Sequence, residues 1–150
     1  MEREDVRNAF FRVELLRRRL VRPYIMDIGL TVGQGQPRIL KELRERGVMT
    51  QKELADICIL DVATMSRTLD RLEQAGLIKR ESNPESRRSW NISLTPDGEK
   101  MADKAIEIFN MTDDVFCKGI TEEELNTLCE ISSKIENNII EAIEGSEKVK

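Results

Sequence analysis

The residues of this sequence best suited to chemistry lie on one side of a predicted helix from Asp61 to about Ala75. On this helix Met65, Leu69 and Leu72 follow the spacing i, i+4, i+7, so their side must face a protein core. The opposite side carries small or polar residues, which are Ala63, Thr64, Arg67 and Arg71. A guanidinium can bond guanine O6 and N7 together, and Ala or Thr methyl groups can touch the thymine methyl. This face therefore suits the major groove of DNA.

Two further groups of residues could contact DNA beside this helix. Thr50 and Gln51 begin the preceding predicted helix, where backbone N–H groups can donate to a phosphate. Arg87 and Arg88 lie at the predicted tip of a β-hairpin, where guanidinium groups suit a narrow minor groove. Each group alone also fits an ordinary solvated surface. Their order along the chain, a helix-turn-helix and then a basic hairpin, is much more specific.

Periodicity and capping signals predict the elements that position these residues. Thr50 and Glu53 form a capping box, and Asp61 is the N-cap of the next helix. Thr95 and Thr121 cap the last two helices. In chain order we predict helices over residues 5–28, 37–47, 50–58 and 61–75, a hairpin over 77–94 with its loop at 82–88, and helices over 95–119 and from 121 onward.

The composition excludes several classes of protein. The chain has 150 residues and no histidine, which removes Ser-His-Asp and Cys-His catalysis and imidazole metal ligands. Cys58, Cys117 and Cys129 are odd in number and lack CxxC spacing, so we expect neither a zinc site nor a disulfide framework. We expect no enzyme, cofactor, secretory signal or membrane span. The cysteine usage favours a reducing cytoplasm.

The net charge of −4 is unevenly distributed along the chain. Residues 1–30 carry seven Arg against five acids, net +2, and residues 31–100 carry twelve basic against eleven acidic residues, net +1. Residues 101–150 carry five Lys against twelve acids, net −7. A local patch decides nucleic-acid binding better than the overall charge does. The first two thirds of the chain can therefore present a basic face.

The stretch from Leu30 to Gly98 resembles the MarR family of winged-helix transcriptional regulators. The strongest matches are T-Q-K-E-L-A from Thr50, D-x-x-T-x-S-R-x-L-D-R-L-E-x-x-G-L-I-x-R from Asp61, and the R-R…I-S-L-T-x-x-G wing from Arg87. The second motif adds Ser66 to the candidate DNA-binding residues. The flanking helices fit the family layout in number and position rather than in motif.

The resemblance implies a mainly α fold with a small β-wing, a winged helix-turn-helix flanked by dimerisation helices. It implies one domain over residues 1–150, with the winged lobe at 30–98 and dimerisation helices at 1–29 and 99–150. The helix 61–75 would enter the major groove and the Arg88 wing the minor groove of a palindromic operator, usually to repress transcription. The long apolar stripes of the terminal helices independently favour a homodimer.

The resemblance also implies release from DNA by a small phenolic or lipophilic effector near the junction of the two lobes. Tyr24, near the end of the first helix, and Met101, early in the fifth, are candidates for this pocket by location only. A core role is the alternative for each residue.

Two residues depart from the family pattern. Ser86 stands where the family wing usually has Asp, which helps to hold the wing arginines. Ile59 stands where the family often has Gly in the turn, and a β-branched residue resists a positive φ. Ile59 therefore predicts either another turn geometry or a strained one.

Three other interpretations stay open at this point. A winged helix can bind protein instead of DNA, although Arg67, Arg71 and Arg88 argue against that. Cys117 and Cys129 could make the protein a thiol-based redox sensor, although Cys117 has a single adjacent base, Lys118, and Cys129 adjoins Glu130. The same dimer could also be an activator or an unliganded repressor.

Overall fold

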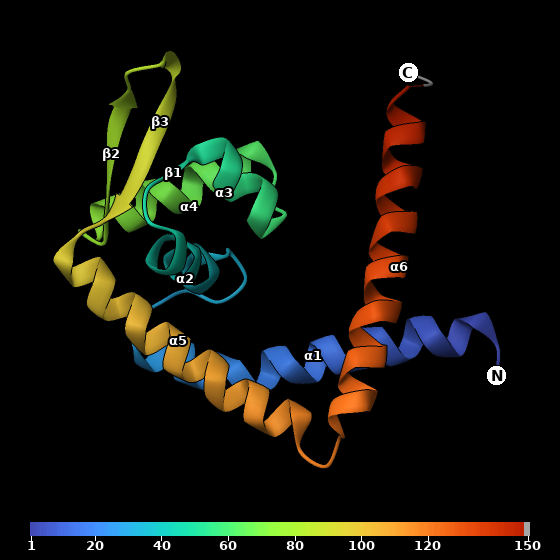
Figure 1. Ribbon diagram of the computed structural model, residues 1–150. Helices are drawn as coiled ribbons and strands as arrows, with labels where there is room; N and C mark the ends of the chain where they lie inside the picture. Colours follow the sequence, from blue (N-terminus) through green and yellow to red (C-terminus); the bar gives the residue numbers. More distant parts are fainter. Residues whose placement is uncertain (149–150) are drawn as a thin grey trace. The chain divides into compact units, whose positions relative to one another are not determined.

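The computed structural model describes residues 1–148 as a mainly helical chain with a small antiparallel sheet, which confirms the predicted fold class. The elements are α1 (Arg3–Asp27), α2 (Gln36–Arg46), β1 (Met49–Thr50), α3 (Gln51–Cys58), α4 (Val62–Gln74), β2 (Ile78–Asn83), β3 (Ser86–Leu94), α5 (Pro96–Cys117) and α6 (Glu122–Glu147) (Figure 1). They divide into two compact units, residues 1–112 and the residues from 113 on. The predicted helices all form, with ends displaced by a few residues.

The core of the first unit lies between the helices and the sheet. It is built from aliphatic side chains that the helical periodicity brings to one side of each element. The side chains of Ile39, Leu54, Met65, Leu69 and Ile92 are wholly buried. Val21 and Ile25, near the end of α1, also join this core. The helix-turn-helix and the wing are thus parts of one packed body.

The sheet has the strand order β1-β3-β2. β1 is only two residues long and pairs Met49 with Ile92 and Thr50 with Asn91. The sequence analysis did not predict β1, because two residues are too few to show the apolar–polar alternation of a strand. β1 connects α2 to α3 and fixes the start of the helix-turn-helix against the wing.

The wing differs from its prediction in the length of its loop. Asn83 pairs with Ser86, so only Pro84 and Glu85 turn the chain. Arg87 and Arg88 therefore lie within β3, and their predicted place at the hairpin tip is wrong. The strands extend further because Asn83 and Ser86 pair beyond a register shift, which leaves residues 87–89 of β3 as a bulge. Figure 1 shows this hairpin projecting from the helices.

The turn between α3 and α4 adopts the second of the two alternatives predicted from Ile59, the strained geometry. Ile59 has φ 51° and ψ 50°, and among the described residues it alone has a positive φ without being glycine. The next residue, Leu60, donates its N–H to the Ala55 carbonyl at 3.0 Å and packs against the core. The left-handed residue costs about 1–2 kcal/mol, and the packing of Leu60 and the two helices opposes that cost.

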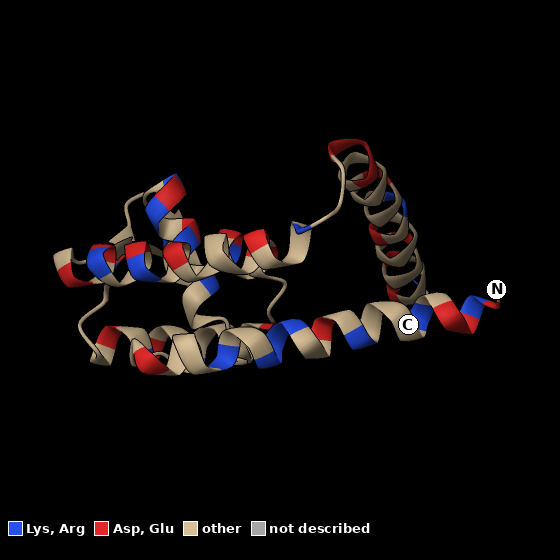
Figure 2. Cartoon of the chain, turned by 90° about the horizontal axis from the view of Figure 1, so that it is seen from below, with Lys and Arg blue, Asp and Glu red and all other residues tan. Residues whose placement is uncertain are grey.

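α1 and α6 are long helices with little buried surface in the single chain. α1 buries only Val21 and Ile25, and none of the residues of α6 is buried. Large apolar side chains remain exposed along both helices, among them Val6, Phe10, Phe11, Val13, Leu15 and Leu16 in α1 and Leu128, Ile131, Ile139, Ile140 and Ile143 in α6. Lys and Arg positions are interspersed with Asp and Glu along α1 (Figure 2). Helices of this kind are marginal in water without a packing partner.

Within residues 1–148, no helix is both long enough and apolar enough to cross a bilayer.

Candidate nucleic-acid interface

The predicted two-sided character of the helix at 61–75 is present in α4. Met65, Leu69 and Leu72 are buried in the core. Ala63, Arg67 and Arg71 are exposed, and Thr64 and Ser66 are half-buried at the edges of that face. The periodicity of the sequence therefore brings the proposed groove-facing residues to the outer side of one helix.

The N-terminus of α4 is organised by Asp61. Its carboxylate accepts hydrogen bonds from the Thr64 N–H at 2.8 Å and from the Thr64 hydroxyl at 2.7 Å. These bonds, the side-chain one first, lower the pKa of Asp61. Arg67 Nη2 donates in turn to the Thr64 hydroxyl oxygen at 3.3 Å. The cap thus gives the Arg67 guanidinium a weak contact with its own helix and leaves its other N–H groups available.

Arg71 is held differently, by a residue outside the helix-turn-helix. Its Nη1 donates to the side-chain oxygen of Gln34, in the loop between α1 and α2. Thr68, one turn earlier on α4, donates its hydroxyl to the backbone carbonyl of Gln34 at 2.9 Å. Nothing in the spacing of the sequence pointed to Gln34, because it lies 37 residues from Arg71.

The start of α3 departs in part from its prediction. The Thr50 hydroxyl accepts from the Glu53 N–H at 3.2 Å, and the Thr50 N–H donates to the Glu53 carboxylate at 2.7 Å. The capping box is thus formed, and it occupies the Thr50 N–H that was expected to be free for a phosphate. In this turn the N–H of Gln51, at the first helical position, remains a potential donor.

The wing presents two arginines from β3. Arg87 and Arg88 are exposed, and neither forms an ion pair within residues 1–148. Trp90 lies two residues beyond Arg88 and is 48% exposed. Arg88 lies in a bulge of β3, since Ser82 pairs with Trp90 and Asn83 with Ser86, and both Arg88 and Trp90 line the groove described below.

Arg80, on β2 of the wing, forms ion pairs with two carboxylates. Its guanidinium bridges Asp70 at 2.7 Å and Glu73 at 3.0 Å, both on α4. The hydrogen bond to Glu73, followed by that to Asp70, raises the pKa of Arg80. Arg80 therefore ties β2 to α4, and two carboxylates already balance its charge.

A groove runs between the helix-turn-helix and the wing. Its lining comes from α3, α4, β2 and β3 and includes Gln51, Lys52, Ser66, Arg88 and Trp90. Val62, the first residue of α4, lines it too and is 77% exposed. The sequence analysis missed Val62, Lys52 and Trp90; for Val62 the position directly after the Asp61 cap was the available signal. The groove brings one residue of each predicted contact region to a single concave surface.

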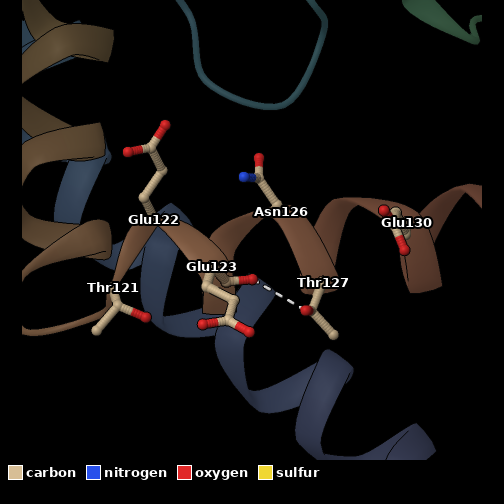
Figure 3. Close-up of a pocket in the computed structure, with 6 residues that line it drawn as sticks. All are labelled: Thr121, Glu122, Glu123, Asn126, Thr127 and Glu130. Atoms are coloured by element: carbon tan, nitrogen blue, oxygen red, sulfur yellow. Dashed lines mark hydrogen bonds between the residues drawn. The ribbon is translucent and has the colours of Figure 1, made fainter.

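Two other depressions lie outside this groove. One, at the start of α6, is lined by Glu122, Glu123 and Glu130, and the Thr127 hydroxyl donates there to the Glu123 carbonyl at 2.9 Å (Figure 3). Its carboxylates would repel a phosphate. The second, which we call the α1 pocket, lies between α1 and the α1–α2 loop and is lined by Leu15, Arg18, Arg19, Arg22, Met26 and residues 30–33.

The two residues predicted for an effector pocket differ in burial. Tyr24 is 45% exposed on α1, and Met101 packs partly buried against the core. Neither lines the α1 pocket. The three cysteines are free thiols, and burial raises the pKa of Cys58.

A helix-turn-helix followed by a two-stranded wing defines a winged-helix protein. The model of the MarR family matches residues 33–90, which span the helix-turn-helix and most of the wing. This match supports a MarR-family winged-helix regulator. Homologues in this family are DNA-binding transcription regulators.

Solved structures show the same fold beyond the matched segment. A mutant MarR from E. coli complexed with operator DNA is 23% identical, covers 87% of this chain and 93% of its own, and has a TM-score of 0.77. A MarR-family transcriptional regulator from Silicibacter pomeroyi is 25% identical, with 87% of each chain covered and a TM-score of 0.75. A SlyA-like transcription regulator from Listeria monocytogenes is 24% identical, covers 90% of this chain and 89% of its own, and has a TM-score of 0.79.

Proposed function

We propose that this protein is a sequence-specific DNA-binding repressor that binds a palindromic operator as a homodimer and is released by a small-molecule effector. The observation that carries the proposal is the outer face of α4, where Ala63, Arg67 and Arg71 stand exposed over a buried apolar face. A protein-binding winged helix has no need for two exposed guanidiniums there. We place the protein in the cytoplasm, where its free thiols stay reduced.

The chemistry assigns a different task to each contact region. Arg67 and Arg71 would donate to base edges or phosphates in the major groove, with Ala63 and Thr64 able to touch thymine methyl groups. Gln51 and Lys52 would bind the phosphate backbone at the start of α3. Arg87 and Arg88 would enter the minor groove from β3. Base contacts on α4 then give specificity, and the other contacts give affinity and position.

The homodimer is supported by the apolar faces of α1 and α6. Both helices leave several large apolar side chains exposed at helical spacing, and contiguous apolar surface of this kind marks an interface. A second copy of the chain is the partner that a palindromic operator requires. A two-fold dimer would place its recognition helices about 34 Å apart, one turn of DNA.

Replacing Arg67 tests the assignment of α4 to the major groove of DNA. We expect Arg67→Ala to weaken operator binding by about 1–3 kcal/mol, roughly 5- to 150-fold, and to relax base preference, because a paired contact to guanine is lost. The measurement is a titration of operator fragments, selected from genomic DNA, at two salt concentrations. Arg88→Ala should instead reduce the slope of log affinity against log salt by about 1 without relaxing the major-groove preference.

Arg44→Ala is the matched control for this titration. Arg44 lies on α2 and pairs with Asp103 at 2.9 Å. Its replacement by alanine therefore removes the same charge at a position away from the proposed interface. Unchanged affinity in both Arg67→Ala and Arg88→Ala would refute the assignment of α4 to the major groove and of the wing to the minor groove. Wild-type binding that is weak, salt-independent and equal on all DNA would favour a protein-interaction module instead.

Effector release is supported by the α1 pocket. Leu15, Met26 and Leu30 give it an apolar wall, and within residues 1–148 Arg19 and Arg22 make no ion pair. These features suit a lipophilic molecule that carries an anionic group. The pocket wall ends at Gly33, and the next residue, Gln34, bonds to α4. An occupant that moves this loop would therefore disturb the recognition helix directly.

Benzoate and its neutral analogue benzyl alcohol test this part of the proposal. We expect millimolar benzoate to weaken operator binding at least about fivefold, the lower range of allosteric coupling, and benzyl alcohol to act much less. Arg22→Ala should abolish the benzoate effect, whereas Arg12→Ala, on α1 but outside the pocket lining, should retain it. An equal benzoate effect in wild type and Arg22→Ala would exclude this pocket.

A further inference from the structure

Gln34 connects the α1–α2 loop to the recognition helix by two separate hydrogen bonds. Its backbone carbonyl accepts from the buried Thr68 hydroxyl at 2.9 Å, and its side-chain oxygen accepts from Arg71 Nη1. The Thr68 hydroxyl also lies 2.8 Å from the Thr64 carbonyl of its own helix. The loop backbone and the loop side chain are thus both directed at α4.

The backbone around Gln34 is narrowly specified. Gly33 and Gly35 flank it with φ of 94° and 78°, in the left-handed region that favours glycine. A Cβ on Gly35 would lie 2.8 Å from Leu60 Cδ1, so the loop packs closely against the helix-turn-helix. With the Thr68 bond, these restraints fix the point from which the Gln34 side chain extends.

Three arginines beside α4 have three different kinds of partner. Arg67 contacts a hydroxyl of its own helix, Arg80 is balanced by two carboxylates, and Arg71 is held by a neutral amide. A neutral acceptor restricts the side chain without cancelling its charge. Ordering a free arginine costs up to about 2 kcal/mol of rotamer entropy, and Gln34 removes part of that cost before any ligand binds.

We propose that Gln34 is a positioning residue that presents the Arg71 guanidinium to DNA as a preoriented, uncompensated cation. This proposal rests on the proposed function, because it assigns Arg71 to the DNA interface. It makes a loop outside the helix-turn-helix part of the DNA-binding apparatus. Gln34 itself acts through Arg71 and needs no contact with the operator.

A double-mutant cycle on operator affinity tests the proposal. Gln34→Ala removes the amide but keeps the backbone carbonyl that Thr68 bonds, so the loop anchor remains. We expect Gln34→Ala to weaken operator binding roughly three- to tenfold in the wild-type background and to have no further effect in Arg71→Ala, as for directly coupled residues. In the Arg67→Ala background the effect of Gln34→Ala should persist in full, because Arg67 does not contact Gln34.

A second measurement, made without DNA, separates this proposal from the proposed function. Nitrogen-15 relaxation of the Arg71 Nε–H should show a restricted side chain in the wild type and a mobile one in Gln34→Ala, with Arg67 unchanged. A mobile Arg71 in the wild type would overturn the proposal, and so would equal effects of Gln34→Ala in the Arg67→Ala and Arg71→Ala backgrounds. A wild-type protein that binds no operator would refute the proposed function, while the relaxation data would still decide whether Gln34 holds Arg71.

Discussion

Ile139→Asp is expected to convert the protein to a monomer and to weaken operator binding by at least about 100-fold, since joining two half-site contacts raises affinity by 10²–10⁴. Ile139 is 54% exposed on α6, in line with Leu128, Ile131 and Ile135 at helical spacing. A carboxylate at the centre of an apolar interface would lose its hydration without gaining a partner. Because Ile139 is exposed in the single chain, the substitution should leave the fold of each chain intact.

Sedimentation equilibrium measures the oligomeric state, and titration of a full operator and of a half-site measures its consequence. The matched control is Asn137→Asp, which adds the same charge two residues earlier, near the opposite side of α6. We expect Asn137→Asp to remain dimeric. A dimeric Ile139→Asp would show that α6 lies outside the interface. A monomeric variant with unchanged operator affinity would show that DNA binding needs no dimer.

Gly98→Ala is expected to lower the free energy of unfolding by about 3 kcal/mol or more, at the upper end of overpacking effects. Gly98 lies buried in the first turn of α5, and an added Cβ would stand 1.8 Å from the Leu77 carbonyl oxygen. That oxygen already accepts from the Thr95 N–H at 3.1 Å, and the Thr95 hydroxyl bonds the Gly76 carbonyl at 2.6 Å. The obstruction is backbone held by these bonds, so a small side-chain adjustment cannot relieve it.

Thermal unfolding measures this loss, and we expect the melting temperature to fall by about 6–12 °C for a chain of this size. Gly145→Ala is the control, because a Cβ there meets nothing within 4 Å and α6 is regular at that position. Alanine in a helix interior is favoured over glycine by about 1 kcal/mol, so this variant should be neutral or stabilised. An unchanged melting temperature in Gly98→Ala would mean that the close approach of α5 to Leu77 is not required.

The helix-turn-helix is the part of the fold that local sequence predicted best. Thr50 with Glu53, and Asp61 with Thr64, act within one helical turn, so their capping bonds are visible from spacing alone. The division of α4 into a buried face at Met65 and an exposed face at Arg67 follows from the same short period. The family resemblance, which residues 33–90 bear out, is carried by these same local motifs.

The wing was predicted in outline but not in register. The alternation of Trp90, Ile92 and Leu94 indicated a strand, yet the pairing of Asn83 with Ser86 depends on a partner strand. Arg87 and Arg88 moved from a loop onto β3 for that reason. The short β1 likewise exists only because Met49 meets Ile92 across the sheet.

By itself, then, the sequence determined the helices, their caps, the outer face of α4 and the apolar stripes of α1 and α6, because each depends on residues within one or two turns of each other. Only the tertiary structure decided which arginines are free and which are held. Arg80 is bound by Asp70 and Glu73, and Arg71 by Gln34. A side-chain contact between separate elements depends on how their backbones pack, and local periodicity carries no information about that distance.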